Sequence, residues 1–406
     1  MNKKLKKRIS ESLHENFYSY IENYKNRDVI NSLNSLLEIN KKKAFSFKTL
    51  LIDGSFYNLG YFYRLQLLRS LIKTNYLEEQ GYIWNYNKKI CKNILKKIGV
   101  SKIHLMDDDR KNRDIYLEAK LIYEKITKPS DILTYEFPEG LPGAHLYDVI
   151  LKRQRSNTVN IQDINLIDYI YEYLSSIYLT KKLLTEFNPD IVALSHGHSI
   201  QCGPMAHLAT KAGIKTLILF GGFGVPRFLN FKKTDDLFFG IPHPPKKDLE
   251  SIEDSRIESF QKIGANYLKN RIKGKFKDLD FGGRLAYGEN KKKLDLIPQK
   301  DINKKVIAVY ISNWFDVPHL FGMNRFLDIL EWTKATIEEA AKNEEVIWLI
   351  KPHPAEEWYA GPSLQESLAI DFPSEVFPDN FGPFKYIFCY SSVVIPLNAF
   401  LLVLFV

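Results

Sequence analysis

Val346-Ile-Trp-Leu-Ile-Lys-Pro-His-Pro-Ala-Glu356 joins a short apolar run to an abrupt polar end. The run is rich in β-branched and aromatic residues, which is typical of a strand buried on both faces of a parallel sheet. The two prolines end the strand, because proline cannot donate to a β-ladder and holds the residue before it in an extended conformation. The pattern therefore predicts Lys351, His353 and Glu356 at the carboxyl end of a buried strand, where open α/β sheets bind their ligands.

The polar residues of this segment suit an anionic ligand group. Lysine supplies a point charge for a phosphate, and histidine supplies a donor that is neutral or cationic near neutral pH. The alternative is an ordinary strand-to-loop turn with incidental polar residues. It explains less well why two prolines flank a histidine directly after an apolar strand.

Length and composition indicate a globular protein of more than one domain. The chain has 406 residues and a formal net charge of +9, and this length is sufficient for two domains with cores of their own. The basic residues are mostly lysines in short, scattered clusters, unlike the concentrated arginine and aromatic platform of a nucleic-acid binder. Scattered lysines indicate a solvated surface or, alternatively, weak attraction to an anionic membrane or substrate.

Cysteine spacing and the N-terminal sequence predict a reducing compartment. The three cysteines lie far apart without a CxxC pair, so we expect neither a disulfide framework nor a structural zinc site. The N-terminal residues are charged and lack an apolar core, so we expect no signal peptide and a cytoplasmic location.

Strand–loop–helix units recur along the chain. The first joins a strand over residues 47–52 through the loop Asp53-Gly-Ser-Phe-Tyr-Asn58 to a helix over 61–72. The second joins a strand over 190–194 through Ser195-His-Gly-His-Ser199 to a helix and a further strand, and it should be a right-handed parallel βαβ unit. A glycine-rich loop, which contains Gly221 and Gly222, follows that further strand.

Other segments of the chain have simpler predictions. Residues 80–187 are mostly helical in pattern, with a short strand at 102–105 and a surface loop at 136–143. A long helix is expected over 248–272. A final βαβ unit is expected to comprise a strand over 305–311, a polar loop containing Asp316 and His319, a helix over 324–341 and the strand that ends near Lys351.

These units predict an α/β fold of two Rossmann-like domains that face each other across a cleft. We expect a basic helical extension (1–46), an N-terminal Rossmann-like domain (47–240), a linking region (241–300), a partial C-terminal Rossmann-like domain (301–383) and an apolar tail (384–406).

The tail has three interpretations. Residues 386–406 contain no charged side chain, which suits a membrane anchor in length and apolarity. A second interpretation is a pair of buried strands that ends a small domain. A third is a truncated or out-of-frame product, and we favour it because a Rossmann half normally contains more strands than this region supplies.

Polar residues at the predicted strand ends suit sugar–phosphate chemistry. Histidine, lysine and the N–H groups at helix starts can stabilise a phosphate leaving group. The carboxylates of Asp53, Asp316 and Glu356 can act as a general base or hold a sugar hydroxyl. We expect no metal, since His196 and His198 are two residues apart with few acids nearby. The glycine-rich loop does not form GxGxxG, so a nicotinamide cofactor is not supported.

Four motifs resemble those of the bacterial capsule polysaccharide biosynthesis family, whose best-understood members are Kdo transferases. They are Asp53-Gly-Ser-Phe-Tyr-Asn58, Ser195-His-Gly-His-Ser-Ile-Gln-Cys-Gly203, Trp314-Phe-Asp-Val-Pro-His319 with Phe326-Leu-Asp328 and Glu331-Trp332, and Lys351-Pro-His-Pro-Ala-Glu356. The likeness runs from about residue 45 to about residue 383, and the last motif is the most specific.

The resemblance implies a GT-B glycosyltransferase fold that uses a nucleotide sugar, with CMP as the expected nucleotide, and no other cofactor. It places His353 on the nucleotide phosphate, Asp316 and His319 on the donor side, and Asp53 and His196 on the acceptor side. The serine- or threonine- and glycine-rich element that closes the donor site in such enzymes has no counterpart in residues 384–406.

The expected partners are the nucleotide sugar, a lipid-linked or glycan acceptor and other capsule assembly proteins at the inner face of the membrane. Two alternatives stay open. One is a non-catalytic polysaccharide-binding or assembly component with a degenerate donor site. The other is a sugar-nucleotide epimerase or phosphotransferase of the same architecture.

Overall fold

The structure is a computed structural model. It describes residues 47–55, 59–72, 77–84, 88–106, 112–220, 227–238, 250, 252–272, 303–323, 325–343, 345–351, 353, 361–368, 387–389 and 400–402. The expected N-terminal extension (1–46), the site residues Gly221, Gly222 and Glu356, and most of the linking region lie outside these residues. The chain divides into two compact units, one formed by Met1–Ile150 with Val159–Gly240 and the other by Leu151–Thr158 with Ile241–Val406.

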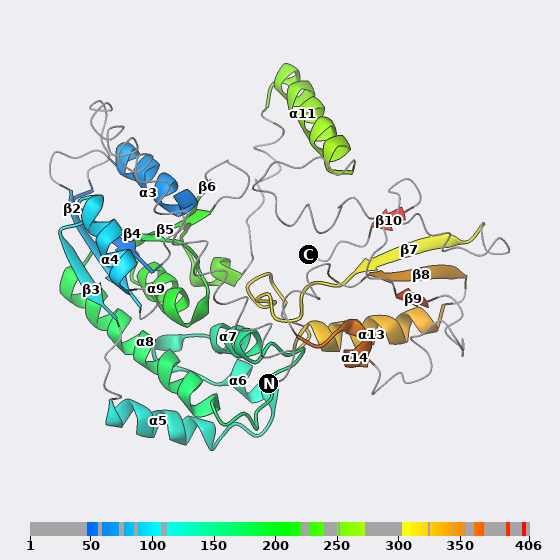
Figure 1. The fold of residues 1–406 in the computed structure, drawn as a ribbon, viewed down its shortest axis with the longest axis horizontal. Coiled ribbons are helices and arrows are strands. Elements are labelled where there is room, and N and C mark those ends of the chain that lie inside the picture. Colours follow the sequence, from blue (N-terminus) through cyan, green and yellow to red (C-terminus); the bar gives the residue numbers. More distant parts are fainter. Residues whose placement is uncertain are drawn as a thin grey trace. The chain divides into compact units, whose positions relative to one another are not determined.

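The first unit contains a six-stranded sheet in the order β3-β2-β1-β4-β5-β6 (Figure 1). Neighbouring strands are parallel except β5 and β6, which are antiparallel. The strands are β1 (Thr49–Asp53), β2 (Glu78–Ile83), β3 (Lys102–Leu105), β4 (Ile191–Leu194), β5 (Lys215–Phe220) and β6 (Arg227–Phe231).

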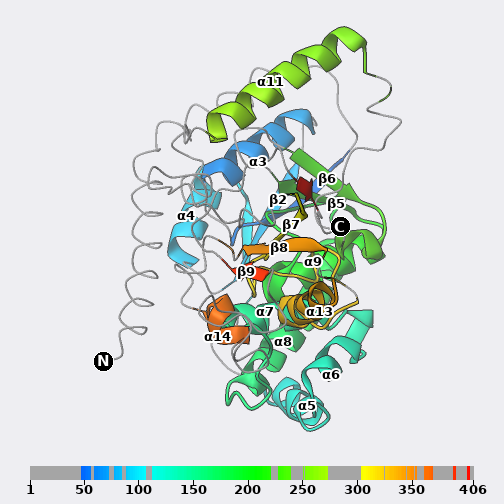
Figure 2. The ribbon, with the colours of Figure 1, turned by 90° about the vertical axis from the view of Figure 1, so that its right-hand side faces the viewer.

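Helices connect and cover these strands. They are α3 (Leu59–Leu71), α4 (Lys88–Lys97), α5 (Arg113–Tyr123), α6 (Pro129–Thr134), α7 (Ala144–Gln154), α8 (Leu166–Phe187) and α9 (Ser199–Lys211), with short 3₁₀ turns at Pro138–Gly140 and Thr234–Phe238. Helix α3 lies on one side of the sheet, and α8 and α9 lie on the other (Figures 1 and 2).

Alternation along the strands decides which side chains enter each core. Leu50 and Ile52 of β1 point to the face covered by α3 and α4, where they join one buried cluster with Phe62, Leu65 and Leu95. Because successive strand residues point to opposite faces, Leu51 and Asp53 point toward the other face. The period-2 pattern thus places a carboxylate inside the protein at the end of β1.

The order of the strands creates a topological switch point. From β1 the chain proceeds to β2 and β3 on one side, and it then returns to form β4 on the other side of β1. In open α/β sheets the crevice outside the carboxyl ends of two such strands is the usual place for a ligand. In this unit the switch point lies between the ends of β1 and β4.

The second unit contains a four-stranded parallel sheet in the order β10-β7-β8-β9. Its elements are α11 (Asp254–Ile272), β7 (Lys305–Tyr310), α13 (Ile329–Ala341), β8 (Val346–Lys351), α14 (Leu364–Leu368), β9 (Ile387–Cys389) and β10 (Phe400–Leu402). Helix α13 begins at the cap residue Asp328, whose side chain accepts a hydrogen bond from the Glu331 N–H at 3.0 Å, as helix N-termini require.

The α/β class and the parallel, Rossmann-like character of both sheets are confirmed. The arrangement of two domains across a cleft stays a prediction. Two strands were not foreseen. The sequence of β2, Glu-Glu-Gln-Gly-Tyr-Ile, lacks the alternation of apolar residues that predicts a strand, because polar residues, Glu79 and Gln80, occupy buried positions in it. The other strand, β6, is an antiparallel edge strand.

The predicted surface loop at 136–143 and the apolar tail both differ in part from expectation. The surface loop at 136–143 is partly internal, since Phe137 and Leu141 are buried. Strands β9 and β10 both fall in the apolar tail and pair with β8 and β7, so these parts of the tail take the strand interpretation; truncation stays a prediction. Of the described helices, none has the length and apolarity needed to span a bilayer.

Candidate functional site

Asp53 and Ser195 meet at the switch point of the six-stranded sheet. Asp53 is the last residue of β1, and Ser195 directly follows β4. The two strands pair in register, with Ile52 opposite Ala193, so both chains leave the sheet side by side. The loops that carry the predicted residues Asp53, His196 and His198 therefore start at the same place.

The Asp53 carboxylate is fully buried and surrounded by donors. One oxygen accepts a hydrogen bond from the Ser55 N–H at 2.9 Å. The other accepts from the Ser195 N–H at 3.3 Å, from the Ser195 hydroxyl and from the Cys202 thiol at 3.6 Å. Such a network compensates the cost of burying a carboxylate. In this structure Asp53 holds the loops after β1 and β4 together, and its role as a general base stays a prediction.

The loop after β4 presents two imidazoles at the start of α9. The His196 and His198 rings contact each other edge to face, with centroids 5.1 Å apart, and both are half-buried. Ser199 has φ +81°, and its hydroxyl accepts from the N–H groups of Gln201 at 3.3 Å and Cys202 at 3.2 Å. The serine hydroxyl thus satisfies two of the free N–H groups of the helix.

Trp84, directly after β2, also forms hydrogen bonds with the loops at this edge of the sheet. The Trp84 N–H donates to the Ser55 hydroxyl at 3.1 Å, and the Trp84 indole N–H donates to the Gln201 carbonyl at 3.1 Å. Gly197 packs closely as well, since a Cβ there would lie 2.4 Å from Ile218. The segments that follow β1, β2 and β4 are therefore fastened to one another.

The acidic groups around Asp53 stay neutral near neutral pH. Burial and, second, the Asp53 charge raise the pKa of Tyr61 and Tyr82 well above the ordinary phenol value. The same two causes raise the pKa of Cys202 well above the ordinary thiol value and that of Cys91 to about 12. A nucleophilic cysteine must be a thiolate, so burial and the neighbouring Asp53 carboxylate disfavour Cys202 as a nucleophile.

The second sheet gathers another set of predicted residues at its carboxyl edge. Strands β7 and β8 pair in parallel with Tyr310 opposite Lys351. The loop after β7, which carries Asp316 and His319, therefore starts beside the end of β8. Asp316 is exposed and His319 is buried, while His353 lies half-buried two residues after β8.

The loop after β7 is fastened to the segment before α14. The Trp314 indole N–H donates to the Pro362 carbonyl at 2.9 Å. A Cβ on Gly361 would lie 2.8 Å from the Phe315 ring, so this position requires a glycine or a shift of the ring. These contacts connect the loop that carries Asp316 and His319 to the segment that follows His353 in the chain.

The structure thus groups the predicted residues by unit. Asp53, His196 and His198 share one edge of the first unit, and Lys351, His353, Asp316 and His319 share one edge of the second. Sequence reasoning missed the contact of Trp84 with Ser55 and with the Gln201 carbonyl, because β2, which ends just before Trp84, carries no strand signal. Within the described residues, no three His, Cys, Asp or Glu side chains group as metal ligands would.

Fold and site define an α/β protein with two Rossmann-like sheets, one mainly parallel and one parallel, each with a polar carboxyl edge. No family model matches the chain, and no curated protein sequence matches it. Among solved structures it is similar to UDP-GlcNAc 2-epimerase from Neisseria meningitidis bound to UDP-GlcNAc, at 12% identity over 84% of this chain and 71% of the other, with a TM-score of 0.23. A TM-score this low does not establish a common fold, so the fold assignment depends on the two sheets described above.

Proposed function

We propose that this chain is a glycosyltransferase of capsular or surface polysaccharide biosynthesis. It transfers a sugar from a nucleotide donor, with CMP-Kdo as the first donor to test, to a lipid-linked or glycan acceptor. The observation that carries the proposal is the pairing of β7 and β8, since it brings the starts of two motif loops to one carboxyl edge. The resemblance of those loops to capsule transferase motifs supplies the donor class.

On the donor side, the second unit binds the nucleotide. Lys351 and His353 contact the phosphate, because cationic donors stabilise the charge that develops on the leaving group. Asp316 and His319 line the sugar from the neighbouring loop. Glu356, Gly221 and Gly222 complete the proposed set of binding and catalytic residues.

On the acceptor side, His196 and His198 bind the acceptor, and both belong to the loop that Asp53 fastens. Asp53 is buried behind this loop. Its contacts favour a positioning role, whereas the general-base role requires the acceptor hydroxyl to reach it. A histidine is the alternative base, because its pKa lies near neutral pH.

Calorimetric titration with CMP tests the donor side. The wild-type chain should release heat on binding CMP, and His353→Ala should weaken the affinity by about tenfold to a hundredfold, as expected for a hydrogen bond to a charged group. His104→Ala, which removes a half-buried histidine from β3 in the other unit, is the matched control and should bind CMP like the wild type. An unchanged affinity in His353→Ala would remove His353 from the site.

Transfer is tested separately by mixing the chain with CMP-Kdo and a lipid-linked glycan and measuring the extended product. A non-catalytic binding component is the second candidate, favoured by the lack, in the sequence of residues 384–406, of the serine- or threonine- and glycine-rich element that closes the donor site in the transferases it resembles. Glycan binding without any heat from CMP would favour this second candidate over the transferase.

A further inference from the structure

Val317 has a backbone conformation that is unusual for a valine. Its φ angle is +48°, in the left-handed region, which residues with a branched Cβ rarely adopt. Five residues other than glycine have a positive φ in the described part of the chain, and of these Val317 alone has a branched Cβ. The proline that follows it favours an extended conformation instead. Strain of this kind is concentrated at functional sites, where the surrounding structure maintains it.

The strained residue stands at the junction of two consecutive turns. The Asp316 N–H donates to the Asn313 carbonyl at 3.3 Å, which closes the first turn. The Leu320 N–H donates to the Val317 carbonyl at 3.1 Å, which closes the second turn. Asp316 is the last residue of the first turn, and Val317 is the first residue of the second. The φ angle of Val317 therefore sets the direction in which Asp316 leaves the second turn.

Both turns are fixed to their surroundings. In the first turn, the Trp314 indole N–H donates to the Pro362 carbonyl at 2.9 Å. In the second turn, the Pro318 carbonyl accepts from the N–H groups of Phe321 at 3.2 Å and Met323 at 3.3 Å. Contacts on either side of the junction thus hold the left-handed conformation in place, which is the condition for such strain to persist in a folded protein.

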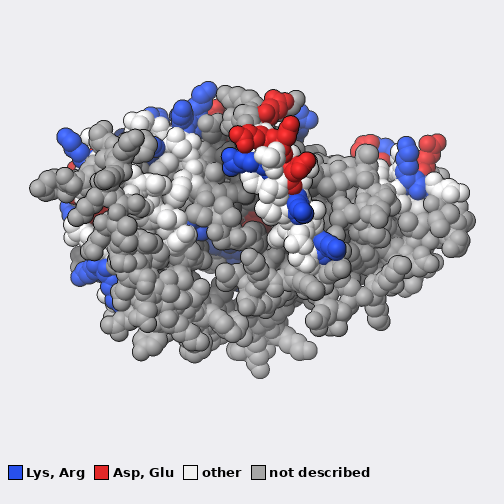
Figure 3. Space-filling view, turned by 90° about the horizontal axis from the view of Figure 1, so that it is seen from above, with Lys and Arg blue, Asp and Glu red and all other residues white. Residues whose placement is uncertain are grey.

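Burial distinguishes Asp316 from the rest of its loop. Exposed Asp and Glu side chains are ordinary at the surface, where Figure 3 shows them among Lys and Arg, so exposure alone marks no site. Of residues 313–319, however, Asp316 alone is exposed and the other six are buried. The loop starts beside the end of β8. A fixed, buried loop therefore presents one carboxylate near the carboxyl edge of the second sheet.

We infer that Val317 is a positioning residue, which directs the Asp316 carboxylate toward a hydroxyl group of the nucleotide-sugar donor. A carboxylate only accepts hydrogen bonds, so it suits a sugar hydroxyl and not a phosphate. A loop that is held in its binding conformation before the donor arrives loses less entropy on binding. The inference rests on the proposed function, because the donor is the ligand of that function.

The alternative role of Val317 is packing alone, since its side chain is only 4% exposed. Replacement by alanine and by glycine separates the two roles. If packing alone matters, alanine is the better replacement, because it keeps more of the side chain and restricts the unfolded chain. If the left-handed backbone matters, glycine is the better one, because it adopts a positive φ without strain.

Urea unfolding tests the backbone without any ligand. Val317→Gly should have a higher urea midpoint than Val317→Ala. Val309 provides the matched control, since it is also 4% exposed and lies in strand β7 of the same unit. There the order should be reversed, with the midpoint of Val309→Ala above that of Val309→Gly, because glycine weakens a strand.

Calorimetric titration with CMP-Kdo tests the positioning role. Val317→Gly should bind the donor within about threefold of the wild type. Val317→Ala should bind it about fivefold more weakly, because only the molecules that keep the left-handed turn are competent to bind. Asp316→Ala should weaken binding by about tenfold, as expected for the loss of a hydrogen bond to a charged group.

Combined variants show whether Val317 acts through Asp316. In chains that also carry Asp316→Ala, the difference in CMP-Kdo affinity between glycine and alanine at position 317 should disappear, because the group that is positioned is gone. The difference in urea midpoint should persist, because the backbone strain does not depend on the carboxylate. A purely structural residue would not separate the two readouts in this way.

Three outcomes would overturn the inference while the proposed function stands. One is a urea midpoint of Val317→Ala equal to or above that of Val317→Gly. Another is a CMP-Kdo affinity of Val317→Ala equal to or above that of Val317→Gly. The third is an affinity difference that persists in the Asp316→Ala background. Failure of the proposed function gives a different result, in which the wild-type chain binds neither CMP nor CMP-Kdo, and this result overturns both.

Discussion

Ser195 donates two hydrogen bonds, from its N–H and from its hydroxyl, to one oxygen of Asp53, which precedes it by 142 positions. This contact joins the ends of β1 and β4 at the switch point. Since the hydroxyl and the carboxylate are both buried, each needs the other as a partner.

We predict that Ser195→Ala lowers the free energy of unfolding by about 1–3 kcal/mol, because a buried carboxylate loses a donor. Urea unfolding measures the change. Ser70→Ala is the control, since the Ser70 hydroxyl donates to the Leu67 carbonyl in its own helix and its removal should cost less than about 1 kcal/mol. Equal costs in the two variants would show that the Asp53 contact is unimportant.

Asp53→Asn separates a positioning role from a catalytic one. If Asp53 positions the loop, the variant should lose stability and acceptor affinity while the pH profile of the remaining transfer activity keeps its shape. If Asp53 is the general base, turnover should fall by about a hundredfold or more and the basic limb of the profile should change. Asp190→Asn, at the opposite end of the same strands, should change stability alone.

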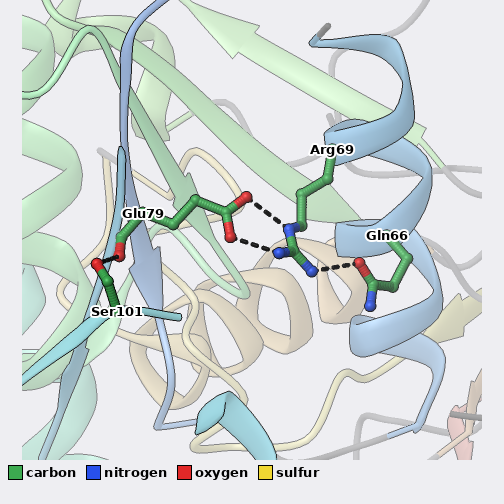
Figure 4. A network of polar contacts seen from close by, with 4 residues as sticks. All are labelled: Gln66, Arg69, Glu79 and Ser101. Carbon is green, nitrogen blue, oxygen red and sulfur yellow. Dashed lines mark hydrogen bonds and ion pairs between the residues drawn. The ribbon is translucent and has the colours of Figure 1, made fainter. Parts of the chain in front are cut away.

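The Arg69–Glu79 ion pair should be worth far more than a surface pair. The guanidinium of Arg69 on α3 donates to both carboxylate oxygens of Glu79 on β2 and to the side-chain amide oxygen of Gln66, and the Glu79 backbone carbonyl accepts from the Ser101 hydroxyl (Figure 4). The two charged side chains are only 9% and 8% exposed. Arg69→Met should therefore cost about 3–5 kcal/mol, because it leaves a buried charge without its partner.

An exposed pair provides the comparison for that measurement. Lys342 and Glu339 form an ion pair at 2.5 Å with side chains 67% and 72% exposed. Lys342→Met should leave the unfolding free energy almost unchanged, because water screens an exposed ion pair. Similar costs for the two methionine variants would contradict the assigned importance of burial.

Two buried histidines should make the first unit sensitive to acid. Burial and, second, His207 lower the pKa of His145 from 6.5 to about 3, and burial and Lys211 lower that of His207 to about 4 against the opposing effect of Asp235. Because these folded-state values lie below the ordinary one, the stability is complete above about pH 6.5 and declines as the pH falls toward the folded values.

Replacement of His145 tests this effect. The wild type should lose several kcal/mol between about pH 6.5 and pH 4, and His145→Gln should lose less over the same range in urea unfolding. The ring of His145 packs on Gly203, where a Cβ would lie 2.7 Å from Nδ1, so the variant will also be less stable at neutral pH. An identical pH dependence in both proteins would contradict the prediction.

Gly361→Ala should weaken nucleotide binding in the second unit. The added methyl group would displace the Phe315 ring and with it the loop that carries Asp316, so the affinity for CMP should fall by about tenfold, while unfolding should change by about 1–3 kcal/mol. Gly264→Ala in α11 meets no atom within 4 Å. It should bind CMP normally and stabilise the helix by about 0.5–1 kcal/mol.

Local features of the sequence sufficed for several elements. The apolar runs that form β4, β5, β7 and β8 predict buried strands, because continuous runs of Val, Ile and Leu are typical of a sheet covered on both faces. The strand β3 was predicted with its observed bounds, Lys102–Leu105. Strand β2 was not predicted. Its residue Glu79 is buried because it bonds to Arg69 on α3, ten residues away, and no local sequence pattern indicates that contact.

The sequence by itself determined that Asp53, Ser195 and Lys351 stand at strand ends, since each follows an apolar run and precedes a turn or a helix. Only the tertiary structure decided that Asp53 meets Ser195, and that β7 and β8 leave the second sheet side by side. The physical reason is that the order of strands in a sheet depends on how the apolar faces of all its strands and helices pack together. Residues 142 positions apart become neighbours through that packing, and not through any preference of their own.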